Sequence, residues 1–182
     1  MALHPSSRLL VLACSATKRD GQSYMPAIQR YDGPLWQTLR AVDPYGEKAK
    51  VAFLSAHLGF CAASSPIESY NALMSDQMAA AMKAGDLGTR WPRPDNQQRG
   101  MPSGEHPGVH IASLTSHKRC PFSDVALAGG HLYLDVMRHL VDLFRIGGYV
   151  VGDAQVCEIN GPIGQMRRDL RLWLDGDDGE GH

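Results

Sequence analysis

Two uninterrupted apolar runs, RLLVLAC at residues 8–14 and KVAFLSA at residues 50–56, constrain the fold of this chain most strongly. A strand that is covered on one face alternates apolar and polar residues, whereas a strand covered on both faces is apolar throughout. Both runs are of the second kind, and each therefore predicts a buried strand in a central sheet. GYVVGD at 148–153 and, more weakly, GVHIASL at 108–114 are further strand candidates.

Four other segments repeat apolar residues at helical spacing. They are PLWQTLRAVD at 34–43, NALMSDQMAAAMKAG at 71–85, HLYLDVMRHLVDLFRIGG at 131–148 and PIGQMRRDLRLWLDG at 162–176. Strands that alternate with helices predict an α/β fold. We therefore expect a single three-layer α/β domain over residues 1–175, with a mostly parallel central sheet flanked by helices.

Two segments lack such periodicity. Residues 85–107 are rich in proline and glycine, which predicts a long loop or lid, with a disordered insertion as the alternative. Residues 176–182 are acidic and contain no apolar side chain, so we expect a disordered tail.

Composition excludes several classes of protein. No apolar run reaches the roughly 18 residues that a membrane span needs, so we expect no membrane partner. The formal net charge of −1 argues against a protein that coats nucleic acid through bulk positive charge, and any such contact needs a local patch. The N-terminus lacks a signal-peptide pattern and the four cysteines form no C-x-x-C pair, so a cytoplasmic location is expected.

The first apolar run ends in Ser15, Thr17 and Lys18. Ligands of open α/β sheets bind outside the carboxyl ends of the strands, and hydroxyl, N–H and ammonium groups there can hold a phosphate or a carboxylate. The glycine spacing of a P-loop is missing. An ordinary polar turn after a strand is the alternative.

The second run ends in the same way, in Ser55 and His57 and then Gly59, with Glu68 and Tyr70 nearby in the sequence. A histidine titrates near neutrality, and together with a carboxylate it can supply acid and base catalysis. Alternatively, His57 is a structural residue at a strand end.

Two further segments offer candidate site residues with competing structural explanations. Tyr31 can stack on a base or pack on a neighbouring aromatic ring, and Asp32 can be catalytic or cap the helix that follows. Near the C-terminus, Arg167 and Arg171 share a helix face behind Gly161 and Gly164, and can bind a phosphate or form a solvated basic face.

Metal ligands are present but poorly spaced. The spacing H-x3-H-x6-H-x2-C matches no standard closed zinc site, and a proline breaks the helix that would align the first two ligands. We expect no metal and no cofactor. The residues concerned are His106, His110, His117 and Cys120.

Taken together, several short motifs resemble those of the YaaA-like family and its small phage and bacterial relatives of unassigned function. They are CSATK after the first run, RYDGPLW at a helix start, FLSAHLGF followed by SPIESYN, and the closing GPIGQMRRDLRLWL. CSATK is also similar to the PCSA-x-K segment of archaeosine synthase-type domains. The resemblance implies a three-layer α/β fold distantly akin to uracil-DNA glycosylases, in a family linked to DNA binding, oxidative stress and modified or 7-deaza bases.

The resemblance also implies a pocket and a phosphate site at matching positions. The pocket residues would be Ser15, Lys18, Tyr31, Gly33, Ser55, His57, Gly59 and Tyr70, and the phosphate residues Gly161, Gly164 and Arg167. This chain departs from the family pattern at His57 and Leu58, where relatives usually have another residue followed by Tyr. Asn71 replaces the usual Asp, which leaves Glu68, Asp32 and Asp153 as possible catalytic carboxylates.

We therefore expect an enzyme that acts on a nucleobase in DNA or on a nucleotide, by N-glycosidic cleavage or by substitution on a modified base. Cleavage places positive charge on the sugar and negative charge on the base, which a carboxylate and a donor such as His57 or Lys18 would stabilise. The predicted catalytic residues are His57, Glu68, Lys18 and Asp32, and Thr17 and Asn71 join the substrate-binding residues.

Because a base must leave the stack to reach a pocket, Tyr31 or Tyr70 would stack on it and residues 85–107 would act as a wedge or lid. One alternative is a non-catalytic DNA-binding or stress-response protein that contacts phosphates through its last helix. Another is an enzyme of free nucleosides or nucleotides.

Overall fold

The computed structural model describes residues 7–91 and 106–176. Its central sheet has the strand order β4-β3-β1-β6-β7, in which only β4 is antiparallel to its neighbour. These strands are β1 (Arg8–Ala13), β3 (Lys50–Ser55), β4 (Gly59–Ala62), β6 (Phe122–Ala128) and β7 (Val150–Ile159). A small antiparallel sheet pairs β2 (Met25–Pro26) with β5 (Pro66–Ile67). The predicted single α/β domain with a mostly parallel sheet is confirmed.

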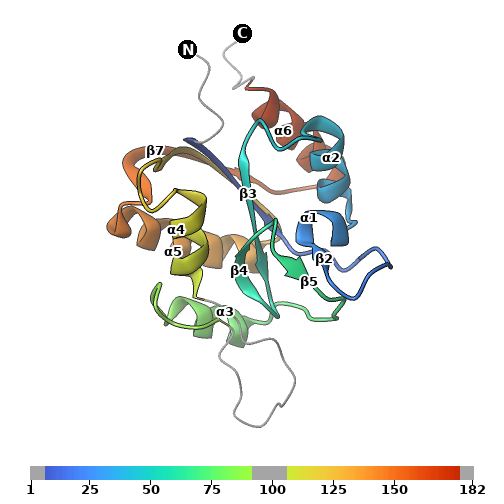
Figure 1. Ribbon diagram of the computed structural model, residues 1–182, viewed down its shortest axis with the longest axis horizontal. Coiled ribbons are helices and arrows are strands. Elements are labelled where there is room, and N and C mark those ends of the chain that lie inside the picture. The colour runs from blue at the N-terminus through green and yellow to red at the C-terminus, as the bar shows by residue number, and fades with distance from the viewer. Residues whose placement is uncertain (1–6, 92–105, 177–182) are drawn as a thin grey trace.

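Helices cover both faces of the central sheet (Figure 1). One face carries α3 (Asp76–Lys83), α4 (Pro107–Leu114) and α5 (His131–Gly147), and the other carries α1 (Ala27–Arg30), α2 (Pro34–Val42) and α6 (Ile163–Asp175). In β1, Leu9 packs into the first layer and Leu10 into the second, and both are fully buried. Burial on both faces is why β1 is apolar throughout. None of the described helices is long and apolar enough to cross a membrane.

The expected strand at 108–114 is wrong, because this segment forms α4. Pro107 occupies the first turn of the helix, where its missing N–H costs nothing and its fixed φ favours helix. The run is too short for its apolar periodicity to separate helix from strand. Its buried residues His110 and Ile111 are adjacent, which suits a helix that contacts the sheet edge at β4.

The central strand β6 was missed, because Asp124 interrupts its apolar pattern. Asp124 is buried and accepts hydrogen bonds from Arg8 Nε at 2.8 Å and from Trp173 Nε1 at 3.1 Å. These contacts tie β6 to β1 and α6. A buried carboxylate of this kind is tolerated because it is paired and hydrogen-bonded.

Other boundaries differ from the predicted ones in detail. Helix α3 begins only at Asp76, where the Ser75 hydroxyl caps it by accepting the N–H of Met78 at 3.2 Å. Strand β7 extends to Ile159 as an edge strand with many exposed residues. In the predicted loop, Trp91 is buried in the core. Residues 92–105 and 177–182 lie outside the described residues, and with them most of the loop or lid predicted at 85–107 and of the tail predicted at 176–182.

The topology identifies one edge of the sheet as the place for a site. The carboxyl ends of the four parallel strands share this edge. From β1 the chain passes to α1 and α2 on one face, whereas from β6 it passes to α5 on the other. Neighbouring strands whose connections diverge in this way form a switch point, outside which open α/β sheets bind ligands.

Candidate functional site

Eight residues gather at the carboxyl ends of β1 and β3, and we call them the Lys18 cluster. Their contacts join the loops after both strands to the loop before α3 and to the first turn of α5. The cluster contains Cys14, Ser15, Lys18, Tyr31, Ser55, His57, Tyr70 and Tyr133. It therefore brings together most of the predicted pocket residues.

A chain of hydroxyl groups forms the buried floor of the cluster. The Ser55 Oγ accepts the backbone N–H groups of His57 and Leu58, both at 3.0 Å, and lies 2.6 Å from the Tyr70 hydroxyl. Because both lone pairs of this oxygen are then occupied, Ser55 donates its own proton to Tyr70. The Tyr70 hydroxyl also bonds to that of Tyr31. Burial raises the pKa of both phenols, so they remain neutral hydrogen-bonding groups.

Lys18 lies above this floor. An isolated antiparallel bridge pairs its backbone with that of Tyr31, and its Nζ donates to the Ser15 carbonyl at 2.9 Å. The same Nζ lies 4.4 Å from the centroid of the Tyr70 ring. Within residues 7–91 and 106–176, no carboxylate forms an ion pair with it. Partial burial lowers the pKa of Lys18, and the nearby Cys14 opposes this shift.

His57 completes the cluster beside Lys18. Its imidazole stacks on Tyr70 with 4.8 Å between the ring centroids and 29° between the ring planes. Partial burial, and then the positive charge of Lys18, lower the pKa of His57. The imidazole is therefore neutral at neutral pH, and it can accept a proton from one group and donate a proton to another.

The shift at His57 makes stability depend on pH. A depressed pKa in the folded protein means that the unfolded chain binds the proton more tightly. The folded protein therefore has its full stability above pH 6.5, the ordinary pKa of histidine, and it loses part of that stability as the pH falls below 6.5. We expect His57→Gln to remove this loss, so that wild type loses stability relative to the variant on acidification. Urea unfolding at several pH values from about 7.5 down to 5 measures the difference.

His57→Phe keeps a ring against Tyr70 without a titrating group, and it should show the same trend as His57→Gln. A difference from wild type that stays constant over this pH range would contradict the assignment.

Two members of the cluster, Cys14 and Tyr133, were not among the predicted site residues. The Cys14 Sγ lies 3.3 Å from the Tyr133 hydroxyl, and burial raises the pKa of this phenol. Cys14 stands in the CSATK motif, which is the signal that could have identified it. Tyr133 has no such signal, because it reaches the site only through the position of α5 after β6.

The predicted catalytic carboxylates have other partners. Asp32 pairs with Arg40 at 2.5 Å and with Arg19 at 3.1 Å. It does not cap α2, whose N-cap is Gly33 without a side-chain bond. Glu68 is exposed, and its hydrogen bond raises the pKa of Tyr24. Asp153 is exposed on β7, so no contact in the described structure brings one of these three carboxylates to Lys18 or His57.

Two predicted pocket glycines have a structural role. A Cβ on the buried Gly33 would overlap the Ser15 Oγ, so a larger residue there would displace the Ser15 side chain. Gly59 has a φ of +73°, and a Cβ there would lie 2.5 Å from the Trp91 carbonyl oxygen. Thr17 accepts the Asp32 N–H through its carbonyl at 2.9 Å, and its side chain is exposed. The exposed Asn71 follows Tyr70.

The predicted phosphate site lies on α6, beside α2 (Figure 1). Gly161, Gly164 and Arg171 are exposed there. Arg167 is half-buried, and its Nε donates to the Thr38 hydroxyl of α2 at 2.9 Å. No contact in the described structure joins Arg167 to the Lys18 cluster, and the observed role of this arginine is to hold α6 against α2.

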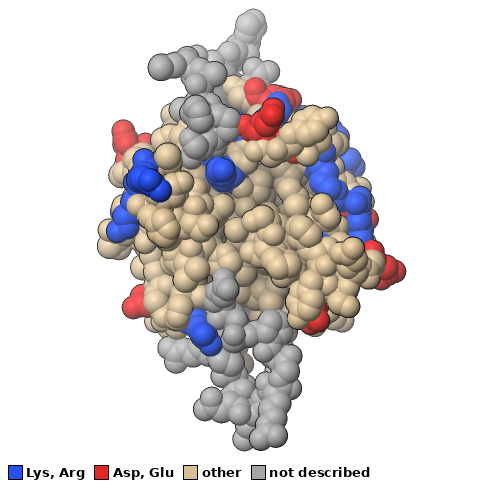
Figure 2. Space-filling model, in the orientation of Figure 1, with Lys and Arg blue, Asp and Glu red and all other residues tan. Residues whose placement is uncertain are grey.

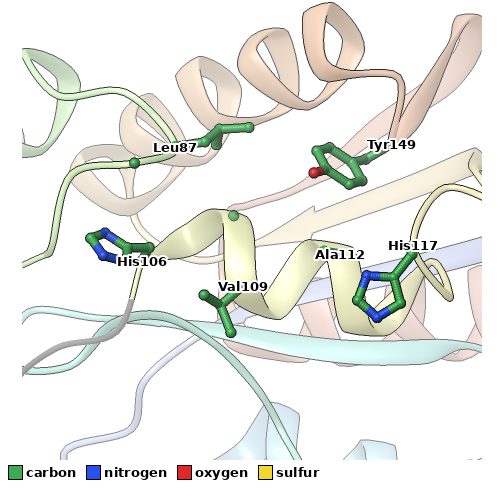
Figure 3. A pocket seen from close by; sticks show the side chains of 8 residues that line it. Leu87, His106, Val109, Ala112, His117 and Tyr149 are labelled. Carbon is green, nitrogen blue, oxygen red and sulfur yellow. The ribbon is translucent and has the colours of Figure 1, made fainter.

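An apolar groove of about 510 Å³ runs along α4, between this helix, Leu87 and Tyr149 (Figure 3). His106 and His117 lie at the two ends of α4, and Tyr149 faces the helix from the turn before β7. His110, the second histidine of the H-x3-H-x6-H-x2-C spacing, is buried and its Nδ1 accepts the Ala62 N–H at 3.1 Å. Among the described residues, no group of three or more His, Cys, Asp or Glu could hold a metal ion.

The cluster also changes the roles expected for the two tyrosines. Tyr31 is fully buried between Trp36 and Phe53, so its ring offers no surface to a base in this conformation. The Tyr70 ring contacts His57 and Lys18. Of the cluster's rings, the half-buried His57 imidazole is therefore better placed than Tyr31 to meet a ligand. No protein-family model, curated protein or solved structure is found to match this chain.

Proposed function

We propose that this protein is an enzyme that acts on a nucleobase in DNA, by cleaving its N-glycosidic bond or by substitution at a modified base. One observation carries the proposal. The ammonium of Lys18 and the imidazole of His57 lie against the same tyrosine ring at the carboxyl edge of the sheet, and no carboxylate of the described residues pairs with either. A site with an amine, a neutral imidazole and a floor of hydroxyl groups suits an electron-rich, hydrogen-bonding ring.

These groups match the charge that glycosidic cleavage develops. Negative charge builds up on the departing base, where the Lys18 ammonium can stabilise it. His57 can relay a proton to the base, because a neutral imidazole accepts a proton at one ring nitrogen and donates one from the other. The hydroxyl chain through Ser55 and Tyr70 fixes the positions of both groups, because it bonds the His57 backbone and supports the ring that Lys18 covers.

Non-catalytic DNA binding is the second candidate, and the surface charge favours it. Lys and Arg side chains gather along one edge of the molecule, over α1 and α2 (Figure 2). The adjoining helix α6 exposes Arg168 and Arg171. A basic surface of this kind contacts phosphates without any need for Lys18 or His57.

Mass spectrometry of bases released from DNA separates the two functions. Normal DNA and DNA with modified bases are each incubated with wild type, with His57→Ala and with Arg171→Gln as a control on the exposed helix face. We expect time-dependent release of a free base by wild type and Arg171→Gln, and strongly reduced release by His57→Ala.

Salt-dependent binding without release, unchanged in His57→Ala and weakened in Arg171→Gln, would support the DNA-binding function and overturn the enzymatic one. Turnover of free nucleosides with little salt dependence would instead identify a small-molecule enzyme.

A further inference from the structure

The cluster contains the predicted Lys18, but no contact of the described residues brings one of the predicted carboxylates to it. Cleavage of a glycosidic bond needs a group that stabilises or attacks the sugar as the base departs. Asp32 is neutralised by two arginines and Glu68 bonds to the exposed Tyr24. Among the described residues, Lys18 is the amine of the cluster, and in its deprotonated form it can attack the sugar that remains once the base has left, close to His57 as a proton acceptor.

The surroundings of Lys18 suit an amine that reacts. Its backbone is fixed by the bridge to Tyr31, and its Nζ is held 2.9 Å from the Ser15 carbonyl, which accepts only one of its protons. Besides this carbonyl, the Tyr70 ring face at 4.4 Å, the Tyr31 ring at 5.8 Å and the nearby Cys14 favour its positive charge. Partial burial without a carboxylate partner lowers the pKa of Lys18, which increases the fraction of free amine.

Other lysines of the chain differ in this respect. Lys83 pairs with Asp135 at 2.5 Å and Lys48 pairs with Asp175 at 2.7 Å. Lys118 lies 5.0 Å from the centroid of the Tyr149 ring, at the opposite end of the sheet from the cluster. It shares the ring contact of Lys18 but lies outside the cluster, and this makes it a matched control.

We propose that Lys18 forms an imine with the sugar of an abasic nucleotide, which gives this protein a strand-cleaving lyase activity at abasic sites in DNA. The inference rests on the proposed function, since it names the sugar that base release would leave in the same site. It goes beyond that function by assigning a second reaction to the cluster.

The reaction needs no external oxidant or reductant. The Lys18 amine adds to the C1′ aldehyde of the ring-opened sugar, and loss of water gives a protonated imine. Neutral His57 removes a proton from C2′, the electron pair forms a C2′–C3′ double bond, and the C3′–O bond breaks so that the 3′ phosphate leaves. Water then hydrolyses the imine, which releases the unsaturated aldehyde and restores the amine.

Borohydride trapping tests the imine directly. An oligonucleotide duplex with one preformed abasic site is incubated with the protein and sodium borohydride, which reduces an imine to a stable secondary amine. We expect wild type and Lys118→Arg to form a covalent protein–DNA adduct that is seen on a denaturing gel. Lys18→Arg should form none, because a guanidinium does not condense with an aldehyde under these conditions.

Peptide mapping of the wild-type adduct keeps the test independent of how the variants fold. Mass spectrometry should place the reduced sugar on Lys18. No adduct with wild type, an adduct on another lysine, or equal trapping by Lys18→Arg would each overturn the inference.

The outcome is also distinct from that of the base-release experiment, because the abasic site is supplied ready-made. Trapping at Lys18 without base release would refute the proposed glycosidic cleavage and retain the lyase. Base release without trapping would refute the lyase and retain the proposed glycosidic cleavage.

Discussion

Asp124→Ala is expected to lower the free energy of unfolding by about 3–5 kcal/mol, the loss typical of a buried ion pair deprived of one partner. Arg8 and Asp124 each retain 7% of their side-chain exposure, and Arg8 lies 4.0 Å from the centroid of the Trp173 ring. Without the carboxylate, Arg8 remains buried with its charge unbalanced. The hydrogen bonds by which Asp124 joins β6 to Arg8 of β1 and Trp173 of α6 are also lost. Urea unfolding followed by circular dichroism measures the change in the free energy of unfolding.

Two further variants test this explanation. Asp175→Ala breaks the exposed pair with Lys48, whose side chains are 55% and 37% exposed, and should cost less than about 1 kcal/mol. Arg8→Met combined with Asp124→Leu removes both charges and should recover much of the stability lost in Asp124→Ala. If the double variant is no more stable than Asp124→Ala, the cost arises from packing and the electrostatic account is wrong.

Lys18→Met is expected to reduce kcat/KM for base release by about 10²–10⁴-fold, the range typical of a lost acid, base or electrostatic contribution. Methionine preserves the length and apolar stem of the side chain while removing the amine. Lys18 is half-buried at the surface of the cluster and has no ion-pair partner among the described residues, so the fold should tolerate this change. Rates of base release under single-turnover conditions, with thermal unfolding of the same samples, measure both effects.

Lys118→Met is the control, because it loses a similar contact with a tyrosine ring at the other end of the sheet. Its rate should equal that of wild type. A Lys18→Met protein that is folded, binds DNA and releases base at the wild-type rate would remove Lys18 from the chemistry. Equal losses in both lysine variants would indicate an effect of overall charge on DNA binding.

Much of the candidate site followed from residues that are near one another in the sequence. Ser15 and Lys18 follow β1 directly, and Ser55 and His57 follow β3, so the carboxyl-edge rule places all four together once the two strands are parallel neighbours. The phosphate-binding residues expected on α6 did not follow in the same way. Their spacing showed that Arg167 and Arg171 share a helix face, and it contained no information on whether that face meets α2 or the cluster.

The sequence by itself determined the class of fold and the strand ends that carry the polar groups, because continuous apolar runs and helical spacing are local consequences of burial. Only the tertiary structure decided the insertion of β6 between β1 and β7, the contact of Tyr133 with Cys14, and the pairing of Asp32 with Arg40. Each depends on a partner from another element, and Asp124 shows why. A charge that looks unsuitable for a central strand becomes stable there once Arg8 and Trp173 supply its hydrogen bonds.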